Sequence, residues 1–571
     1  MTNIDLDMEI KTGLYWKVKT EDLWLQSGVF FLFLGTLPFL LQSLLFIAGF
    51  GVADLLFPFI LIGVSAYYGG FCISKKMPVV IIVSWNFLMI GMLFAAGLIS
   101  MNVYDFSYDG MWYHQDAVRL LEQGWNPYHH ILSVGETAGS YLFVNHYPKA
   151  VWTSEAVVYA FSNKLESAKI INWIFLYASF CLSAYTLRKV FLFGWFWTVL
   201  IGLMISFNPV VICQLFSFYI DGIVANLILC LLLIVLLYIK GVLSLPLFLV
   251  LLSCTAIFLI NTKFTALVYV CIFSAVYFAY QWFLKKREAI RTVYVAGSIV
   301  ALGVLVFGYP TYVNNTLTKG HPFYPIMGED NVGGVILNTP NPTNFRGRNR
   351  FEQFNLATFA KPLWSRAPES SKSKALFTIE GITIYDEYKR ADPEMSGFGP
   401  LFAEVVFMLL GGILILLVWN RKVFTLDICI GLATLVFSII CIPAFWHARY
   451  APQIWTLVCG VILLLLRTKY TAWLGYTILL IQLVNCSMVA QQNWNTQIQK
   501  TQELNAFFSE LKSKNKLSVI FEGWTGSFGI KLKENNIPYV PVRNAYSENA
   551  FVYFPNVGGM CGAYVVKTRT N

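Results

Sequence analysis

Charge is scarce in this chain. Asp, Glu, Lys and Arg make up 13% of its 571 residues, about half of the roughly 25% that soluble globular proteins carry. Hydrophobic residues make up 57%, and long apolar runs occupy most of the length. This composition excludes an ordinary soluble enzyme, a disordered protein and a fibrous protein. The chain is therefore expected to be a polytopic membrane protein.

Several motifs of soluble enzymes are missing as well. The 11 cysteines form no C-x-x-C pair, so neither a disulfide framework nor a cysteine zinc site is expected. No His-Glu-x-x-His sequence occurs, and His129 and His130 are adjacent rather than four residues apart, which argues against a histidine zinc site. Walker and G-x-S-x-G patterns are absent from any suitable context.

The excess of positive charge does not indicate a nucleic-acid-binding protein. There are 41 Lys and Arg residues against 31 Asp and Glu, a net charge of +10. A nucleic-acid interface typically has a stripe of basic residues interleaved with aromatic residues, and this sequence has no such stripe. Many basic residues lie instead in short gaps between apolar runs, where positive charge sets the orientation of a membrane protein.

Thirteen apolar runs are candidate membrane spans, since a spanning helix needs about 20 mostly apolar residues. They cover residues 28–48, 52–72, 79–101, 168–187, 190–209, 222–239, 243–261, 264–284, 292–310, 400–419, 424–443, 451–466 and 471–490. The expected fold class is therefore mainly α, a polytopic transmembrane helical bundle.

The distribution of Lys and Arg orients these runs. With the N-terminus in the cytoplasm, the inside gaps hold 16 Lys and Arg residues, and the short outside gaps hold only Lys263 and Arg449. Positive charge favours the cytoplasmic side, so we expect an integral protein of the plasma or inner membrane with a cytoplasmic N-terminus. The C-terminus and all six histidines then lie outside, so any active site is expected to be extracytoplasmic.

The expected domain organisation follows the chain. It consists of N-terminal transmembrane helices (1–101), a first extracytoplasmic loop with surface helices (102–167), transmembrane helices (168–310), a long extracytoplasmic loop (311–399), C-terminal transmembrane helices (400–490) and a small extracytoplasmic soluble module (491–571). In the last part a polar helical pattern precedes short β-branched runs at 517–521 and 537–542. That pattern predicts an α/β module of roughly 80 residues, near the lower size for independent folding.

The first outside loop carries two acidic residues, Asp105 and Asp109, just before a helical pattern. An amphipathic helix directly after a span is expected to lie along the membrane surface, with Asp109 at its start. Asp is also a favoured N-cap, because its side chain accepts bonds from free backbone N–H groups. A capping role and a chemical role for Asp109 are therefore both open, and they can coexist.

Three other outward turns carry polar or charged residues. One has Tyr219 and Asp221, one has Lys263 between two apolar runs, and one has His447 and Arg449. Positive charge is scarce on this face, so Lys263 and Arg449 indicate an anionic partner. The alternative for either cation alone is snorkelling to lipid headgroups, which is less favoured for two cations beside acidic turns.

These motifs resemble those of the GT-C glycosyltransferase superfamily. The resemblance rests on Asp109-Gly-Met-Trp-Tyr113-His114 after a third helix, Asn208-Pro209 with Tyr219-Ile-Asp221, Asn261-Thr-Lys263-Phe264-Thr265, Ala448-Arg449-Tyr450-Ala451-Pro452, and Gly320-His321-Pro322-Phe323-Tyr324-Pro325 in the long outside loop. It covers about residues 1–490 in architecture. It implies an enzyme that moves a hexosyl or pentosyl group from a polyprenyl-phosphate carrier to an extracytoplasmic glycan, lipid or protein acceptor, usually with inversion.

The resemblance also implies roles for single residues. Asp109 matches the first-loop acid that acts as catalytic base, with Asp105 as the alternative. The donor phosphate would be bound by Arg449, Lys263 and His447, and the substrates would be positioned by His114, Tyr113, Asp221, Tyr219, His321 and Tyr324. No metal ligand is assigned. A divalent cation such as Mg²⁺ or Mn²⁺ stays open, because metal use varies in this superfamily.

The chemistry of the residues agrees with these roles. A sugar linked through phosphate leaves behind a stabilised anion, so the leaving group needs no proton. A glycosidase, by contrast, needs a second carboxyl group as general acid. Here one base for the acceptor hydroxyl and cations for the departing phosphate suffice.

Two other classes of membrane protein remain open. A lipid-linked oligosaccharide polymerase or ligase also uses such donors and a large outer loop, but it tends to rely on outer-loop arginines. A polytopic transporter or flippase should show an internal repeat or paired broken helices, and neither is evident. We therefore rank glycosyltransferase first, polymerase or ligase second and transporter third.

Overall fold

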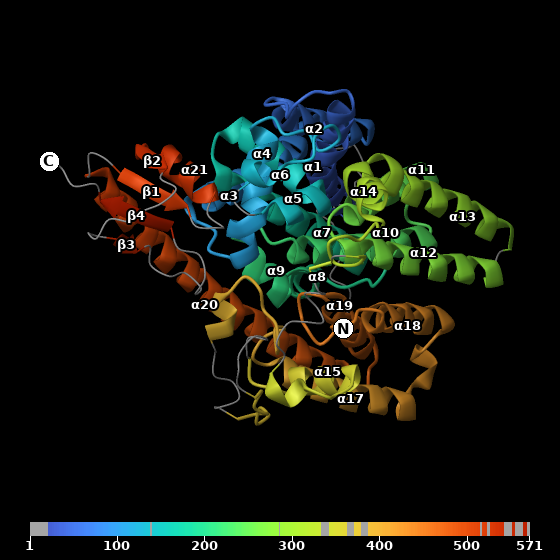
Figure 1. Ribbon diagram of the computed structural model, residues 1–571. Coiled ribbons are helices and arrows are strands. Elements are labelled where there is room, and N and C mark those ends of the chain that lie inside the picture. Colours follow the sequence, from blue (N-terminus) through green and yellow to red (C-terminus); the bar gives the residue numbers. More distant parts are fainter. Residues whose placement is uncertain are drawn as a thin grey trace.

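The computed structural model describes residues 21–137, 140–284, 286–329, 331–332, 342–362, 370–378, 386–513, 517–521, 526–541, 551–553 and 563–567. This described chain is mainly helical, as the composition predicts (Figure 1). Its strands all lie after the last long helix.

Nine helices of the described chain are long and apolar enough to cross a membrane. They coincide with or overlap α1 (Glu21–Ile47), α2 (Leu56–Ser74), α3 (Val79–Asn102), α7 (Ile170–Lys189), α10 (Asp221–Ile239), α12 (Phe264–Leu284), α13 (Lys286–Ala301), α17 (Phe402–Trp419) and α20 (Ala472–Lys512). Helices of this length and composition are what a bilayer selects. They indicate a membrane protein, as the sequence predicts.

Four more of the expected runs coincide with shorter apolar helices. These are α8 (Trp195–Ser206), α11 (Leu245–Ile260), α18 (Leu426–Ile440) and α19 (Gln453–Arg467). They have 12 to 16 residues, so each is about 18–24 Å long, shorter than the roughly 30 Å of a hydrocarbon core.

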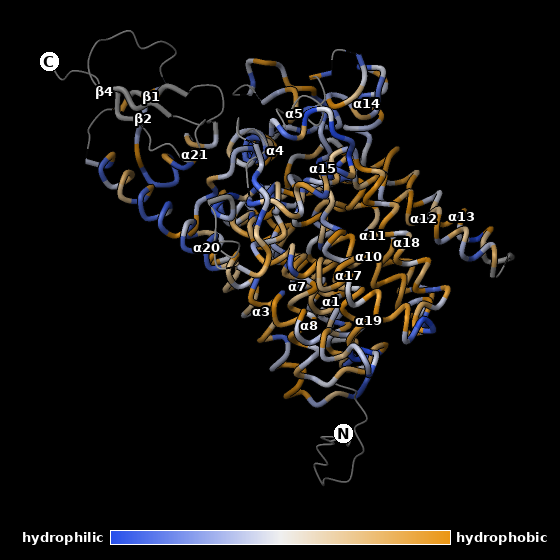
Figure 2. Tube along the Cα trace, turned by 90° about the horizontal axis from the view of Figure 1, so that it is seen from below, coloured by the Kyte–Doolittle hydropathy of each residue, from blue (hydrophilic) through white to orange (hydrophobic). Residues whose placement is uncertain are grey.

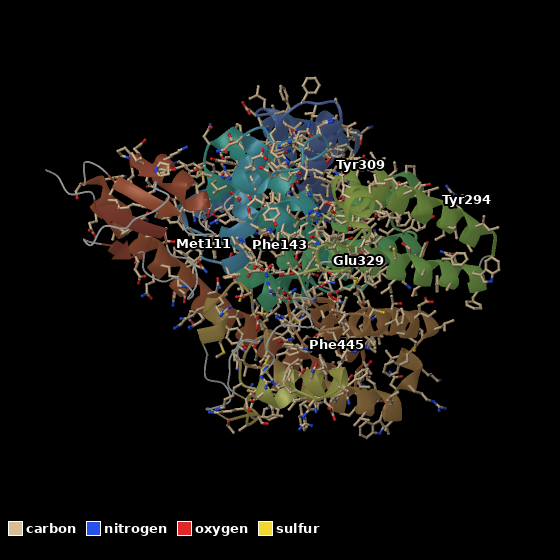
Figure 3. The ribbon with its side chains drawn as sticks, in the orientation of Figure 1. Met111, Phe143, Tyr294, Tyr309, Glu329 and Phe445 are labelled. Carbon is tan, nitrogen blue, oxygen red and sulfur yellow. The ribbon has the colours of Figure 1, made fainter. Side chains whose placement is uncertain are left out.

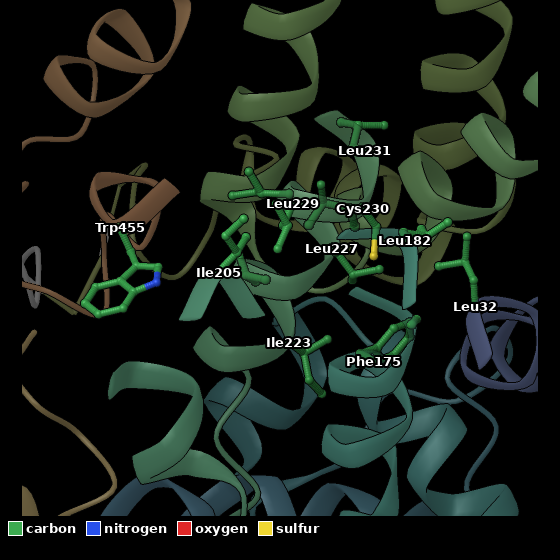
Figure 4. Packing of buried hydrophobic residues seen from close by; sticks show 14 of the residues in the cluster. Leu32, Phe175, Leu182, Ile205, Ile223, Leu227, Leu229, Cys230, Leu231 and Trp455 are labelled. Carbon is green, nitrogen blue, oxygen red and sulfur yellow. The ribbon is translucent and has the colours of Figure 1, made fainter. Parts of the chain in front are cut away.

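The centre of the bundle is formed by α7, which packs against α1 and α10. Gly28 and Gly35 of α1 face α7, where a Cβ atom would lie 2.8 Å from Leu182 and 2.7 Å from Phe175. Glycine lets the two backbones approach this closely. Figure 4 shows Leu182 and Phe175 beside Leu32 of α1, within the buried apolar cluster.

Polar loop segments gather at one end of the bundle, while the bundle helices are largely hydrophobic (Figure 2). This end contains α4 (Gln115–Glu122), α5 (Tyr141–His146), α14 (Asn314–Lys319) and α15 (Arg350–Thr358). His146 Nδ1 and Asn315 Oδ1 lie 2.7 Å apart, so the loop at 102–167 and the loop at 311–399 are in direct contact.

The helix after Asp109 differs from the expectation. It begins as a π-helix, η1 (Gly110–His114), and continues as α4. Gln115 and Asp116 at its start are buried, and α6 (Ala150–Ser162) packs against α4. The start of this segment is therefore buried inside the protein rather than free on its surface, because α6 and other parts of the first loop pack against it.

The last long helix crosses the expected boundary at residue 490. α20 runs without a break from Ala472 to Lys512, 41 residues, or about 60 Å. Its outer half projects from the bundle toward the C-terminal strands (Figure 1). The apolar run thus ends before the helix does.

A four-stranded sheet follows α20. It contains β1 (Leu517–Phe521), β2 (Tyr539–Pro541), β3 (Phe551–Tyr553) and β4 (Ala563–Lys567) in the order β2-β1-β4-β3. β1 pairs with β2 in parallel through the crossover helix α21 (Gly526–Glu534), and β4 pairs with β1 and β3 antiparallel. Leu504 and Phe508 of α20 share a core with Leu517 and Phe528 of this region, so the sheet packs on the end of α20.

Candidate functional site

Four charged residues from distant parts of the chain meet in one place. Asp109 precedes η1, Asp221 begins α10, Lys263 follows α11, and Arg449 lies in the turn before α19. Arg449 Nη1 is 3.4 Å from Asp109 Oδ2 and 4.0 Å from Asp221 Oδ2, and Lys263 Nζ contacts Asp221 Oδ1. We call this group the Asp109–Arg449 site. All four residues belong to the set predicted from the sequence.

Figure 3 labels residues from two of the chain segments that contribute to this site. Met111 and Phe143 belong to the first outside loop, and Phe445 precedes Arg449 by four residues. The contact between Asp109 and Arg449 joins the first loop to the turn between α18 and α19.

Asp109 keeps partial access to solvent. Its side chain is 20% exposed and makes no capping hydrogen bond, so the N-cap role considered from the sequence is not what holds it. Its backbone N–H donates to Tyr219 Oη at 3.4 Å. Burial raises the pKa of its carboxyl above the usual range, Arg449 opposes that shift, and the charges of Asp392 and Asp221 add to it.

Arg449 is held by two aromatic rings. Its guanidinium carbon lies 5.2 Å from the ring centroid of Tyr219 and 5.1 Å from that of Tyr450, within the range of cation–π contacts. Its side chain is 13% exposed. Its Nε is buried and has no hydrogen-bond partner in the described part of the chain. A buried donor left unpaired is costly, so this N–H is available to an anionic ligand.

Asp221 and Lys263 form the second ion pair of the site. Gln214 Nε2 also donates to Asp221 Oδ2 at 3.2 Å. Lys263 Nζ lies 4.8 Å from the ring centroid of Tyr450, the ring that also contacts Arg449. One tyrosine ring therefore contacts both cations of the site.

Asp105 occupies a different environment. It is buried, with Oδ1 accepting the Ser107 N–H at 2.8 Å and Oδ2 accepting the Phe218 N–H and Gln115 Nε2 at 3.1 Å. Burial and the nearby Glu166 raise the pKa of its carboxyl. These bonds fasten the first loop to the turn that carries Tyr219. They also bury the Asp105 carboxylate, whereas Asp109, four residues later, stays partly accessible.

His114 and Tyr113 lie behind the site. His114 Nδ1 accepts a bond from Trp152 Nε1 at 2.6 Å, and burial lowers the pKa of His114 to about 3, so the ring is neutral. Tyr113 is buried and stacks on Phe143 with ring centroids 5.1 Å apart. His114 also lies 6.1 Å from Tyr219, centroid to centroid. Both residues support the Tyr219 side of the site.

His447 lies beside the site but pairs with an acid. Its Nε2 is 3.2 Å from Glu394 Oε1, and both side chains are 5% exposed. Burial lowers the pKa of His447, although Glu394 opposes this. His447 therefore contacts Glu394 of the long loop. It does not join Lys263 and Arg449, the two cations predicted to bind the donor phosphate with it.

His321 and Tyr324 belong to the segment after α14. The Phe323 N–H donates to His321 Nδ1 at 3.1 Å, and Asn315 Nδ2 donates to the Tyr324 carbonyl at 2.9 Å. The His146 and Tyr324 rings are 4.8 Å apart. The structure thus anchors this segment to the first loop. Among the described contacts, these two residues do not touch the Asp109–Arg449 site.

Three neighbours of the site have no role assigned to them from the sequence. Tyr450 contacts both cations. Tyr147 packs its ring on Tyr113 at 5.7 Å, and burial, together with the charge of Asp109, raises the pKa of Tyr147. The side-chain amide of Gln453 is buried four residues after Arg449. Tyr450 and Gln453 lie one and four residues after Arg449, so their sequence distance from Arg449 could have predicted a place near the site. Nothing in the sequence around Tyr147 predicts such a place.

A divalent cation is not favoured by this arrangement. Among the residues that the structure describes, no group of three or more His, Cys, Asp or Glu side chains could hold a metal ion. The two site carboxylates, Asp109 and Asp221, are each in contact with a cationic side chain, so they are already neutralised. The residues present do not fit Mg²⁺ or Mn²⁺.

The arrangement combines three chemical features. It has one partly accessible carboxylate with a raised pKa, two cations on one aromatic ring, and an unpaired guanidinium N–H. A carboxylate with a raised pKa is a stronger proton acceptor than an ordinary carboxylate. The cations can bind an anion such as a phosphate. Comparison with protein-family models, curated proteins and solved structures finds no match to this chain.

Proposed function

We propose that the chain is a membrane glycosyltransferase of the GT-C type. It transfers a hexosyl or pentosyl group from a polyprenyl-phosphate donor to a hydroxyl of an extracytoplasmic glycan, lipid or protein, with inversion. The observation that carries the proposal is the meeting of one accessible carboxylate, Asp109, with two cations, Lys263 and Arg449, from separate parts of the chain.

In this proposal Asp109 is the general base. Its carboxylate takes the proton of the acceptor hydroxyl while the hydroxyl oxygen attacks the anomeric carbon of the donor sugar. The bond from that carbon to the phosphate oxygen breaks, and its electron pair leaves on the phosphate. Asp105 is less suited to this role, because its carboxylate already accepts three hydrogen bonds.

Arg449 and Lys263 bind the donor phosphate. The unpaired Nε of Arg449 supports this role, since a guanidinium can bind phosphate through two parallel N–H bonds. An incoming phosphate competes with Asp109 for Arg449, so donor binding frees the base as it fills the site. The cations then stabilise the charge that develops on the leaving phosphate.

Arg449→Ala should weaken donor binding as well as turnover. Loss of a hydrogen bond to a charged group removes about 1.5–3 kcal/mol, so kcat/KM for the donor should fall about 10- to 100-fold, with a higher KM. Arg449→Lys should recover part of the loss, because it keeps the charge without the two-bond geometry. The matched control is Arg421→Ala, at an exposed arginine between α17 and α18. An unchanged KM for the donor would contradict the phosphate-binding role.

The membrane arrangement is part of the proposal. We place thirteen spans across the plasma or inner membrane, with the N-terminus in the cytoplasm and the site and the chain after residue 490 outside. Lys and Arg number 16 in the inside gaps against two outside, which supports this orientation.

Cysteine labelling tests the orientation. Single cysteines introduced at Ser509, exposed on the outer half of α20, and at Ser74, exposed at the end of α2, should differ in intact cells. An impermeant thiol reagent should label the first and spare the second until the cells are opened. The unaltered chain measures the background from its own cysteines. The reverse pattern would invert the topology and remove the proposed site from the outside.

The activity itself is testable with the purified full chain. Incubated with a polyprenyl-phosphate-linked sugar and a candidate acceptor, it should release free polyprenyl phosphate in step with glycosylated acceptor. A panel of polyprenyl-phosphate donors with different sugars, each offered with several acceptors, identifies the pair that the chain uses.

A further inference from the structure

An apolar crevice lies between two groups of helices, away from the Asp109–Arg449 site. α10, α11, α12 and α13 form one wall, and α18 and α19 form the other. Its volume is about 480 Å³, within the roughly 300–1,000 Å³ of small-molecule sites. Ile205, Leu229 and Leu231, visible in Figure 4, contribute to its mostly apolar lining. In Figure 1 the hairpin of α12 and α13 extends beside α18.

One end of the crevice has a basic rim. Lys240, directly after α10, and Arg291, near the start of α13, line this end, and both are exposed. Neither has an ion-pair partner in the part of the chain that the structure describes. Asp427 also lines the crevice and accepts a bond from Tyr280 Oη at 3.2 Å. Lys240, Arg291 and Asp427 together carry a net charge of +1 at the crevice.

The rim and the Asp109–Arg449 site lie at opposite ends of the same helix. α10 begins at Asp221, in the site, and ends at Ile239, just before Lys240, after 19 residues. That is about 28 Å, close to the roughly 30 Å thickness of a hydrocarbon core. The rim therefore lies at the headgroup level of the other leaflet, and the crevice extends from it into the hydrocarbon region.

We propose that this crevice binds an anionic phospholipid, with acyl chains in the apolar part and the phosphate on Lys240 and Arg291. Apolar walls at hydrocarbon depth match acyl chains. Cations near a membrane surface attract anionic headgroups, and each Lys or Arg raises the binding affinity by a factor of about five. A lipid seated here bridges the two walls, which Tyr280 and Asp427 already join at the rim. The proposal is independent of sugar transfer.

Native mass spectrometry of the purified full chain in detergent tests the site. The probes are phosphatidylglycerol and phosphatidylcholine with identical acyl chains. Phosphatidylglycerol should bind about tenfold more tightly, because two cations act and Asp427 offsets part of their effect. Replacing Lys240 and Arg291 together with Gln should remove this preference. Lys75→Gln, an exposed lysine at the end of α2 that does not line the crevice, should retain it.

Filling the crevice provides a second, independent variant. Gly431 of α18 lines the crevice, and a Cβ atom there meets nothing within 4 Å, so Gly431→Phe should place its ring in the lipid volume. Binding of both lipids should fall several-fold. Gly411→Phe is the matched control, because its Cβ also meets open space and it lies outside the crevice. Equal retention of the two lipids by the wild-type chain, or equal effects of Gly431→Phe and Gly411→Phe, would overturn the proposal and indicate nonspecific lipid only.

Discussion

Asp109→Asn is expected to lower kcat for sugar transfer by about 10²–10⁴-fold, because general-base catalysis typically contributes that much. Asn keeps the shape of the side chain but cannot take the proton of the acceptor. The Asp109 side chain caps no helix, so the fold should survive the change. Release of polyprenyl phosphate by the purified variant measures the effect, and donor binding by the same sample reports whether the site is intact.

The pH profile adds a readout that a structural role would not give. Burial raises the pKa of Asp109, and the base acts only when ionised, so the wild-type rate should fall as pH drops through this raised pKa. Asp109→Asn should lose that dependence together with the rate. Asp54→Asn, at an exposed carboxylate between α1 and α2, should leave both unchanged. Sugar transfer by Asp109→Asn at the wild-type rate would exclude Asp109 as the base.

The helical part of the fold could be predicted because membrane helices follow hydropathy closely. In lipid every backbone polar group must be satisfied within the segment, so an apolar run of spanning length forms a helix, as at α10. The same rule fails at the end of α20. There the helix continues past residue 490 because Leu504, Phe508 and Leu511 form a stripe that packs on β1 and α21, and hydropathy alone does not register such a stripe.

The site could be predicted only as a set of separate residues. Scarce charge on the outer side identifies Lys263 and Arg449, because isolated cations there need a partner. Their partners could not be deduced, since Arg449 meets Asp109 across 340 residues of sequence. The pairing of His447 with Glu394 was missed for the same reason.

Asp105 and Asp109 show why sequence spacing could not distinguish the environments of the two acids. Both acids precede the same helix, four residues apart. In the structure Asp105 meets backbone N–H groups and is 1% exposed, whereas Asp109 meets a guanidinium and is 20% exposed. The difference comes from which distant elements reach each residue, namely the turn at Phe218 for one and the turn at Arg449 for the other.

Lys531→Met should loosen the contact between α21 and the first outside loop by about 3–5 kcal/mol, the usual cost of removing one partner of a buried ion pair. Lys531 Nζ lies 3.0 Å from Glu166 Oε1 and 3.4 Å from the Asp105 carbonyl oxygen. The side chains of Lys531 and Glu166 are 4% and 2% exposed. In the Lys531→Met variant Glu166 still contacts Lys169, whose Nζ lies 2.6 Å from Glu166 Oε2. The charge of Glu166 would then be only partly compensated.

Hydrogen exchange of the α21 amides measures this opening directly, since protection reports the local free energy. Lys533→Met is the matched control, because Lys533 is exposed on the same helix and should change protection by less than about 0.5 kcal/mol. Glu166→Gln combined with Lys531→Met should cost less than the sum of the two single changes, as expected for a direct pair. Equal protection in Lys531→Met and wild type would mean that the pair does not hold α21 in place. If protection is lost, sugar transfer should fall too, because Glu166 Oε2 accepts the Asp105 N–H at 3.1 Å and Asp105 fastens the loop that carries Asp109.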